Sequence, residues 1–172
     1  MRDDKTLTSW NGLMLRAFAE AGAVLDRPDY IAAAQKNASL LLRKLKDGNR
    51  ILRTYKDGKS KLKGYLDDYS SLIDGLLTLH EADLQQKWLT EANNIAQHMI
   101  ELFWEPTNSQ FYDTGSDHEP LILRPRDTTD NAIPSGNSMA AEVLLKLSVI
   151  TGNVDYQTKA VESLRSVREL MA

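Results

Sequence analysis

An internal repeat limits the fold of this chain more than any other sequence feature. Tyr30 and Tyr156 lie 126 residues apart, and each follows an aspartate and precedes an alanine by four positions. The same offset aligns Asn11 with Asn137, and a middle copy, shifted by about 59 residues from the first, carries Trp88. Units that recur at such a spacing indicate an array of similar supersecondary elements, each packed against the next.

Each copy has the apolar spacing of two helices joined by a short turn. The predicted helices span residues 9–24, 29–45, 67–82, 87–104, 135–151 and 155–171. They form three helical hairpins at about 8–45, 67–104 and 135–171, and residues 1–172 together make a single unit. The sequence therefore predicts an all-α fold in which the three hairpins form a closed or curved array.

The connections between the hairpins differ from the short turns within them. Residues 50–66 alternate around Asp57-Gly58, a dipeptide typical of a tight turn between two antiparallel strands. Residues 110–124 are interpreted as a second, looser hairpin with Gly115 near its tip. Two short β-hairpins are thus expected to link the three helical units.

The leading helix of the third copy is apolar on nearly every side. In the segment from Met139 to Ile150, nine of the twelve residues are apolar. A helix of this kind needs neighbours on several sides, and three hairpins alone would leave part of it uncovered. We therefore expect the chain either to form one arc of a larger ring or to self-associate.

Composition excludes several classes of function. The 172 residues carry 21 basic and 24 acidic side chains, which gives a net charge of −3. This charge lacks the excess of basic residues that is typical of proteins that bind nucleic acid or an anionic membrane. There is no cysteine for a disulfide, a thiolate metal site or a cysteine nucleophile. No apolar run approaches the ~20 residues that span a bilayer. We expect a cytoplasmic protein without a cofactor or a metal.

Three short motifs give the chain a resemblance to a known family. They are residues 3–14 (DDKTLTSWNGLM), residues 66–70 (LDDYS) and residues 134–138 (PSGNS), in that order. Together they resemble the YyaL-like family of thioredoxin-domain-containing proteins, which includes the spermatogenesis-associated proteins. In that family a thioredoxin-like domain precedes a six-hairpin (α/α)6 toroid, which is similar to those of N-acylglucosamine 2-epimerases and six-hairpin glycosidases.

The resemblance implies that all 172 residues form the later part of such a toroid. It thereby implies an all-α fold with three α-hairpins of a partial (α/α)6 toroid and two short β-hairpin connections. The thioredoxin-like domain with its cysteines has no counterpart in this sequence, so no redox role is carried over. The implied activity is carbohydrate processing of glycosidase or epimerase type, an analogy that rests on the fold.

In such a ring the leading helices point the same way, and their first turns gather at one mouth. Free backbone N–H groups at a mouth of this kind favour anions and hydroxyl-rich ligands. The polar and aromatic side chains there are the predicted ligand-binding residues, namely Trp10, Asn11, Asp67, Tyr69, Arg124, Ser135 and Asn137. The same residue types also serve as helix caps, so capping remains the alternative role for each of them.

Paired carboxylates at the same mouth are candidates for the general acid and base of glycoside cleavage. The candidate pairs are Asp67 or Asp68 with Asp127 or Asp130, the latter two in the loop before the third leading helix. Of these, Asp68, Asp127 and Asp130 are the predicted catalytic residues. The alternative is a structural ion network, in which Arg124 and Arg126 pair with these aspartates and hold the loop.

The residues support two functional hypotheses. In the first, the chain is part of a hydrolase or isomerase that binds a carbohydrate-like small molecule at the mouth of the toroid. In the second, it is a non-enzymatic helical scaffold whose apolar concave face meets a second copy of the chain or the remaining part of a longer protein. Convergence of the polar residues in one pocket favours the first hypothesis, whereas their dispersal to separate helix caps favours the second.

Overall fold

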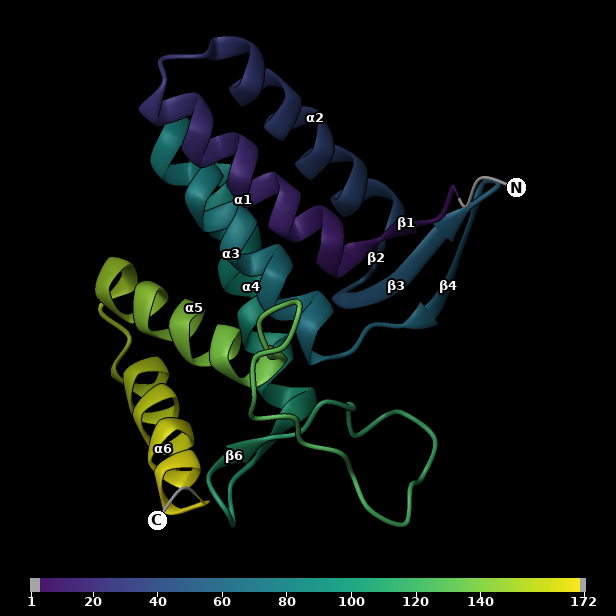
Figure 1. Ribbon diagram of the computed structural model, residues 1–172, viewed down its shortest axis with the longest axis vertical. Coiled ribbons are helices and arrows are strands. Elements are labelled where there is room, and N and C mark those ends of the chain that lie inside the picture. The colour runs from purple at the N-terminus through teal and green to yellow at the C-terminus, as the bar shows by residue number, and fades with distance from the viewer. Residues whose placement is uncertain (1–3, 171–172) are drawn as a thin grey trace.

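The computed structural model describes residues 4–170, and this part of the chain contains six helices (Figure 1). They are α1 (Thr8–Val24), α2 (Pro28–Lys44), α3 (Leu66–Asp83), α4 (Gln86–Phe103), α5 (Gly136–Thr151) and α6 (Val154–Leu170). These bounds match the predicted ranges to within one residue and confirm the all-α class. Asp3, in the first motif, and Met171, at the predicted end of the last helix, lie outside the described residues. Within residues 4–170, no helix combines the length and the apolar character that a bilayer crossing needs.

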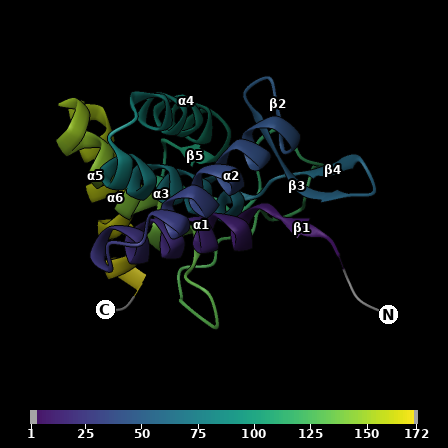
Figure 2. The same cartoon turned by 90° about the horizontal axis from the view of Figure 1, so that it is seen from above.

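Helix α3 lies at the centre of the molecule, between α1 and α5, with its hairpin partner α4 on a further side (Figures 1 and 2). Its side chains are buried along almost the whole helix, including Tyr69, Ile73 and Leu76. Helix α5, which is apolar on nearly every side, packs against α3 and α6. It leaves Val149 and Ile150 exposed near its end, as expected for an apolar helix that lacks a further neighbour.

Helices α1 and α3 approach each other closely because glycines stand at their crossing. A Cβ atom on Gly12 would lie 2.6 Å from the carbonyl carbon and oxygen of Ser71. A Cβ atom on Gly75 would lie 2.7 Å from the carbonyl oxygen of Gly12. Any side chain larger than hydrogen would push the two helices apart, so these glycines set the distance between the first two repeats.

A small antiparallel sheet lies beside the starts of α1 and α3 (Figure 1). Its central strand β3 (Arg50–Lys56) pairs with β4 (Lys59–Lys63) on one edge and with β1 (Thr6–Leu7) and β2 (Lys46–Asp47) on the other. Asp57 and Gly58 form the β3–β4 turn with φ angles of 49° and 77°, so the first predicted hairpin is confirmed. Strand β3 also carries Arg53 to the start of α3, where it contacts two aspartates.

The second predicted hairpin lies earlier in the chain than expected. Strand β5 (Trp104–Glu105) pairs with β6 (Gln110–Phe111), so the hairpin spans residues 104–111 and not 110–124. The Glu105 carboxylate closes the turn by accepting from the backbone N–H groups of Thr107 and Asn108. Farther along, Pro120 and Pro125 lack the N–H donors that a strand pair needs, and residues 112–135 contain no helix or strand.

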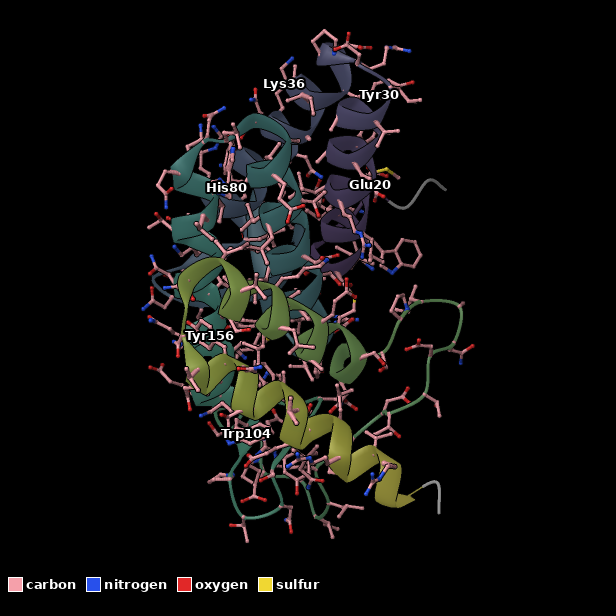
Figure 3. All side chains as sticks on the ribbon, turned by 90° about the vertical axis from the view of Figure 1, so that its left-hand side faces the viewer. Glu20, Tyr30, Lys36, His80, Trp104 and Tyr156 are labelled. Atoms are coloured by element: carbon pink, nitrogen blue, oxygen red, sulfur yellow. The ribbon has the colours of Figure 1, made fainter. Side chains whose placement is uncertain are left out.

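Helix α6 covers the outer side of the third repeat. Figure 3 shows Tyr156 near its start, with Trp104 farther along the same side of the molecule. The Tyr156 hydroxyl donates to the side-chain oxygen of Asn93 at 2.8 Å and so ties α6 to α4. The Trp104 ring meets Phe111 edge-on, with 4.9 Å between the ring centroids, and this contact packs the β5–β6 hairpin.

Candidate functional site

A cavity of about 280 Å³ opens between the starts of α3 and α5. Its wall comes from β3, from the turn before α3, from the segment after β6 and from the loop before α5. The lining residues are Arg53, Tyr65, Asp67, Asp113, Asp127, Thr129, Asn131, Ile133, Pro134, Ser135 and Gly136. Three carboxylates, one guanidinium and one aromatic ring therefore border a single hollow.

The two helix starts meet at this cavity because the backbone of α5 passes close to that of α3. A Cβ atom on Gly136 would lie 3.0 Å from the backbone nitrogen of Asp67, so only glycine fits there without displacement. The Leu66 N–H donates to the Asp113 carbonyl at 3.0 Å, which holds the segment after β6 against the start of α3. The starts of the second and third leading helices thus lie side by side.

Asp67 and Arg53 form an ion pair in the cavity wall. The Arg53 guanidinium donates to the Asp67 carboxylate at 3.1 Å and to the Asp68 carboxylate at 2.8 Å. The same guanidinium lies 4.8 Å from the centroid of the Tyr65 ring, a cation–π contact that orients both side chains. Asp67 is a predicted binding residue, whereas Arg53 and Tyr65 were not expected. Their sequence positions, in a hairpin strand and in its connection to α3, carry no signal for a site.

Asp68 lies beside this ion pair and has no exposed surface. One carboxylate oxygen accepts from the Ser9 N–H at 3.0 Å and the other from the Tyr65 N–H at 3.0 Å. A single side chain thus caps the starts of both α1 and α3. Burial, followed by repulsion from Asp67, raises the pKa of Asp68 to about 6 despite the contact with Arg53. Asp68 has no exposed surface and is not among the lining residues of the cavity, and its catalytic role stays a prediction.

Asp113 is the wall residue that the sequence did not reveal. One of its carboxylate oxygens accepts from the Asp127 N–H at 2.8 Å and the other from the Asn137 amide at 3.2 Å. Partial burial is the main cause that raises the pKa of Asp113 to about 6, and the charges of Asp127 and Asp67 act in the same direction. Sequence reasoning passed over Asp113 because it falls inside the stretch interpreted as a β-hairpin.

Three predicted site residues lie at or behind this wall. Asp127 lines the cavity and is exposed to solvent. Ser135 lines the cavity as the N-cap of α5, where its hydroxyl oxygen accepts from the Ser138 N–H at 3.1 Å. Asn137 is buried, and its amide donates to Asp113 and to the Asp127 carbonyl. These contacts hold the loop before α5 against the start of that helix.

Two predicted site residues make structural contacts instead. Asp130 accepts from the Ser135 N–H at 2.9 Å and from the Ser138 hydroxyl at 3.0 Å, so it supplements the cap of α5. These hydrogen bonds lower the pKa of Asp130, which is not among the lining residues, and its catalytic role stays a prediction. Arg124 donates to the Thr114 carbonyl and is not among the lining residues, so its ligand contact also stays a prediction.

The remaining predicted site residues lie outside the cavity. Trp10 is on α1 with 62% of its surface exposed, and the Asn11 amide donates to the Leu7 carbonyl at the start of the same helix. Tyr69 is fully buried, and its hydroxyl oxygen accepts from Arg50 at 2.7 Å. The ligand contacts of these three residues stay predictions that this cavity does not include. The cavity lies between the starts of α3 and α5. Because successive helical positions point about 100° apart, Tyr69 can lie near a lining residue in the sequence and still point away from the cavity.

The three histidines of the chain are not among the lining residues. His80 contacts the Gln85 carbonyl at 3.1 Å, near the end of α3, and His98 lies on α4. His118 contacts the Arg50 guanidinium at 2.7 Å, and burial together with this positive charge lowers its pKa. Among residues 4–170, no group of three or more histidine, aspartate or glutamate side chains is arranged so that it could hold a metal ion.

Named relatives cover almost the whole chain, although no known protein-family profile matches it. Spermatogenesis-associated protein 20 of Mus musculus is 35% identical over 183 residues, which covers 98% of this chain and 23% of the relative. The Homo sapiens protein of the same name is 34% identical over 180 residues, with the same two shares, 98% and 23%. The chain thus spans about a quarter of the length of the curated relatives it matches. The resemblance inferred from the three motifs is confirmed.

Solved structures of low sequence identity share the fold. The GH76 alpha-mannanase of Bacteroides thetaiotaomicron has a TM-score of 0.76 at 13% identity, over 96% of this chain and 45% of its own. Cellobiose 2-epimerase of Bacillus thermoamylovorans has a TM-score of 0.78 at 10% identity, over 98% and 46%. An inactive alpha-1,6-mannanase variant of Salegentibacter, in complex with alpha-1,6-mannotriose, has a TM-score of 0.74 at 16% identity, over 94% and 46%. These neighbours are (α/α)6 toroids, and the chain has the fold of about half of such a ring.

Proposed function

We propose that this chain, homologous along nearly its whole length to spermatogenesis-associated protein 20, contributes a carbohydrate-binding cavity to a hydrolytic site. The ligand is a neutral, sugar-like molecule that binds between the starts of α3 and α5. The observation that carries the proposal is the cavity, in which Asp67, Asp113 and Asp127 border a space beside the Tyr65 ring. Since the chain spans about a quarter of its curated relatives, the activity of a complete ring is part of the same proposal.

The wall offers the groups that recognise hydroxyl-rich rings. The carboxylates of Asp67 and Asp127 accept hydrogen bonds from sugar hydroxyls, and the hydroxyls of Thr129 and Ser135 both donate and accept. Tyr65 is 37% exposed and offers an aromatic ring for the apolar carbons of a sugar. The single guanidinium of the wall is already paired with Asp67, which favours a neutral ligand over a phosphate or a carboxylate.

The fold neighbours support a carbohydrate as the ligand. The Salegentibacter mannanase in complex with mannotriose is an inactive variant, in which two consecutive aspartates are replaced by asparagine. The present chain also has two consecutive aspartates at the start of α3, and Asp67 of this pair lies in the cavity wall. At 16% identity the likeness concerns the fold, so the shared pair is an indication for the proposal and no role is transferred.

Hydrolysis fits the wall better than epimerisation. Glycoside cleavage needs a pair of carboxyl groups beside the scissile bond, and this wall contains three. Proton abstraction from carbon, as in epimerisation, is most often the task of a base such as histidine that is poised near neutral pH. None of the three histidines lines the cavity.

Ligand binding tests the proposal before the natural substrate is known. We expect at least one oligosaccharide in a panel with alpha-1,6-mannotriose and cellobiose to raise the Tm on the order of 5 °C at saturation, because a ligand of the native state stabilises it. Thr129→Trp fills the cavity and should abolish this rise, whereas Thr158→Trp, on the exposed face of α6, should preserve it. A panel in which no neutral sugar changes the Tm contradicts the proposal.

A second function is favoured by a different observation, the exposed apolar side of α1. Trp10, Met14 and Val24 are 62%, 52% and 77% exposed, and their helical spacing places them on one face. As the alternative, this face meets a second copy of the chain or the remaining part of a longer protein. We expect sedimentation velocity to show self-association that Trp10→Ser weakens. A strict monomer that binds no hydrophobic dye contradicts this alternative.

A further inference from the structure

Resting on the proposed function, we infer that Asp113 donates the proton to the leaving group and that Asp67 is its ionised partner in the same cavity. Both carboxyl groups line the hollow, so a ligand bound there is within reach of each. Three features distinguish Asp113 and Asp67 from each other and from the nearby aspartates. They are the contacts that hold each side chain, the charges around it and its access to the cavity.

Backbone and side-chain contacts hold Asp113 from three directions. Its carbonyl accepts from the Leu66 N–H at the start of α3, and its own N–H donates to the Pro125 carbonyl, both at 3.0 Å. Its carboxylate accepts from the Asp127 N–H at 2.8 Å and from the Asn137 amide at 3.2 Å. A proton donor needs such a fixed place, because general acid catalysis depends on hydrogen-bond reach to the reacting atom.

The charged neighbours of the two carboxyl groups differ. Asp67 forms an ion pair with the Arg53 guanidinium at 3.1 Å. Asp113 forms no ion pair with a cationic side chain among the described residues. Burial is the main cause of the raised pKa of Asp113, and the charges of Asp127 and Asp67 add to it. The hydrogen bond from the Asp127 N–H and the charge of Arg126 lower this pKa, each by less than burial raises it. A carboxyl group with a raised pKa beside a second carboxylate that is paired with a guanidinium is an arrangement that acid–base sites use.

Access separates Asp113 from Asp68. Burial favours the neutral form of Asp68 as well, but this side chain has no exposed surface. Its two oxygens are bonded to the N–H groups of Ser9 and Tyr65 at the starts of α1 and α3. Asp113, in contrast, is partly buried, lies in the cavity wall and forms no ion pair with a cationic side chain among the described residues.

The proposed step is hydrolysis of a glycosidic bond, with water as the co-reactant. The O–H bond of Asp113 breaks and its proton bonds to the glycosidic oxygen, while the bond from that oxygen to the anomeric carbon breaks and leaves its electron pair on the oxygen. Water adds to the anomeric carbon, and the proton that it releases passes to the Asp67 carboxylate. Return of a proton from Asp67 to Asp113 through solvent restores the site, with one water consumed for each bond cleaved.

Carbon-13 NMR of the aspartate carboxyl groups tests the inference in the unmodified chain. With signals assigned through the backbone, we expect the Asp113 carboxyl group to titrate near pH 6, because its pKa is raised to about 6. An unperturbed aspartate titrates near ~3.9. Titration of Asp113 at that ordinary value overturns the inference even if sugars bind, since its protonated fraction near neutral pH would then be about 100-fold smaller than at a pKa of about 6.

The dependence on the leaving group provides the second test. A 2,4-dinitrophenyl glycoside departs without protonation, whereas a methyl glycoside needs a proton donor. For Asp113→Asn we expect kcat/KM to fall about 100-fold or more on the methyl glycoside and less than about 10-fold on the dinitrophenyl glycoside. The matched variant Asp155→Asn, exposed at the start of α6, should change neither value.

The outcomes separate this inference from the function on which it rests. If the wild-type chain is active and Asp113→Asn lowers both rates equally, or lowers neither, the inference is wrong and the proposed function stands. If neither this chain nor a full-length protein that contains it hydrolyses a glycoside, both are wrong. Should Asp113→Asn fail to fold, the NMR titration of the wild-type chain decides the question.

Discussion

The α1–α3 junction and the α3–α5 junction are equivalent contacts between successive repeats, yet the first is sealed and the second borders a cavity. At the α1–α3 junction, Gly12 and Gly75 bring two helix backbones into contact, and Asp68 caps both helix starts. At the α3–α5 junction, Gly136 brings the start of α5 near Asp67, but the loop before α5 borders a cavity and does not fill it.

The difference lies in what holds the aspartate of each junction. Asp68 accepts hydrogen bonds from the two helix starts that it joins, and its side chain has no surface exposed to solvent or to the cavity. Asp113 accepts from a loop N–H and from a side-chain amide, and it still lines the cavity. Asp68 therefore stabilises the contact between two helix starts, whereas Asp113 lies in the cavity wall.

Removal of the shared cap should have the largest effect on stability. In Asp68→Ala the N–H groups of Ser9 and Tyr65 lose their acceptor, and Arg53 loses its nearest carboxylate. We expect the free energy of unfolding in urea to fall by about 3 kcal/mol. Asp67→Ala, which removes only the partner of Arg53 on the cavity side, is the matched control and should cost less. Equal losses would show that the α1–α3 junction does not depend on the cap.

Two glycines of α1 offer a sharper test of the sealed junction. In Gly12→Ala the new methyl group meets the Ser71 backbone at 2.6 Å, and we expect a loss of about 2 kcal/mol in urea unfolding. In Gly22→Ala it meets chiefly the end of the Ile31 side chain, which can move, so the change should stay within about 1 kcal/mol. Similar values for both variants would contradict the close backbone contact at Gly12.

The pH dependence of stability should separate the two junctions. Burial raises the pKa of folded Asp113 to about 6, so the folded state binds more protons than the unfolded state between about pH 4 and pH 6. The free energy of unfolding therefore falls as the pH rises through this window. We expect Asp113→Asn to reduce that fall by roughly 1.5 kcal/mol, after allowance for the partial exposure of the group.

The part of the pH dependence that remains in Asp113→Asn belongs in large part to Asp68, whose pKa is also raised to about 6 at the sealed junction. Urea unfolding at a series of pH values measures both contributions. A variant with the same pH profile as the wild-type chain would show that Asp113 has an ordinary pKa and would remove the contrast between the two junctions.

The smallest expected effect concerns the cap of α5 beside the cavity. Ser135→Ala removes the acceptor of the Ser138 N–H, but Asp130 still accepts from the backbone N–H of residue 135 and from the Ser138 hydroxyl. We therefore expect a loss of only about 0.5 kcal/mol, with faster hydrogen exchange in the first turn of α5. A loss of about 2 kcal/mol, as at the strongest caps, would mean that Asp130 does not share this role.

Much of the fold could be predicted from the sequence because its signals are local. The spacing of apolar residues and the repeat offset located all six helices of the described part of the chain, and Asp57-Gly58 located the first β-turn. The second hairpin was misplaced because its turn depends on hydrogen bonds from the Thr107 and Asn108 N–H groups to the Glu105 carboxylate. No sequence motif indicates these contacts.

The site was less accessible because it depends on which helix starts meet. The repeat indicated that Asp67 and Ser135 lie at a common mouth, and both residues line the cavity. It could not indicate that Asp68 turns inward to cap α1, or that Asp113 reaches the start of α3 through the Leu66 N–H. Such contacts join segments far apart in the chain, so they do not appear in the spacing of apolar residues or in the repeat offset.

Mapping a sugar onto the two junctions tests most directly whether the hollow one is the binding site. A titration of the labelled chain with alpha-1,6-mannotriose, or with whichever neutral sugar raises the Tm, can be followed by proton–nitrogen NMR. We predict that the largest shift changes fall on the amides of Asp113, Asp127 and Ser135, with Ser9 and Gly12 unchanged. Changes confined to α1 and the sealed junction, or no changes at saturating sugar, would contradict a carbohydrate site between α3 and α5.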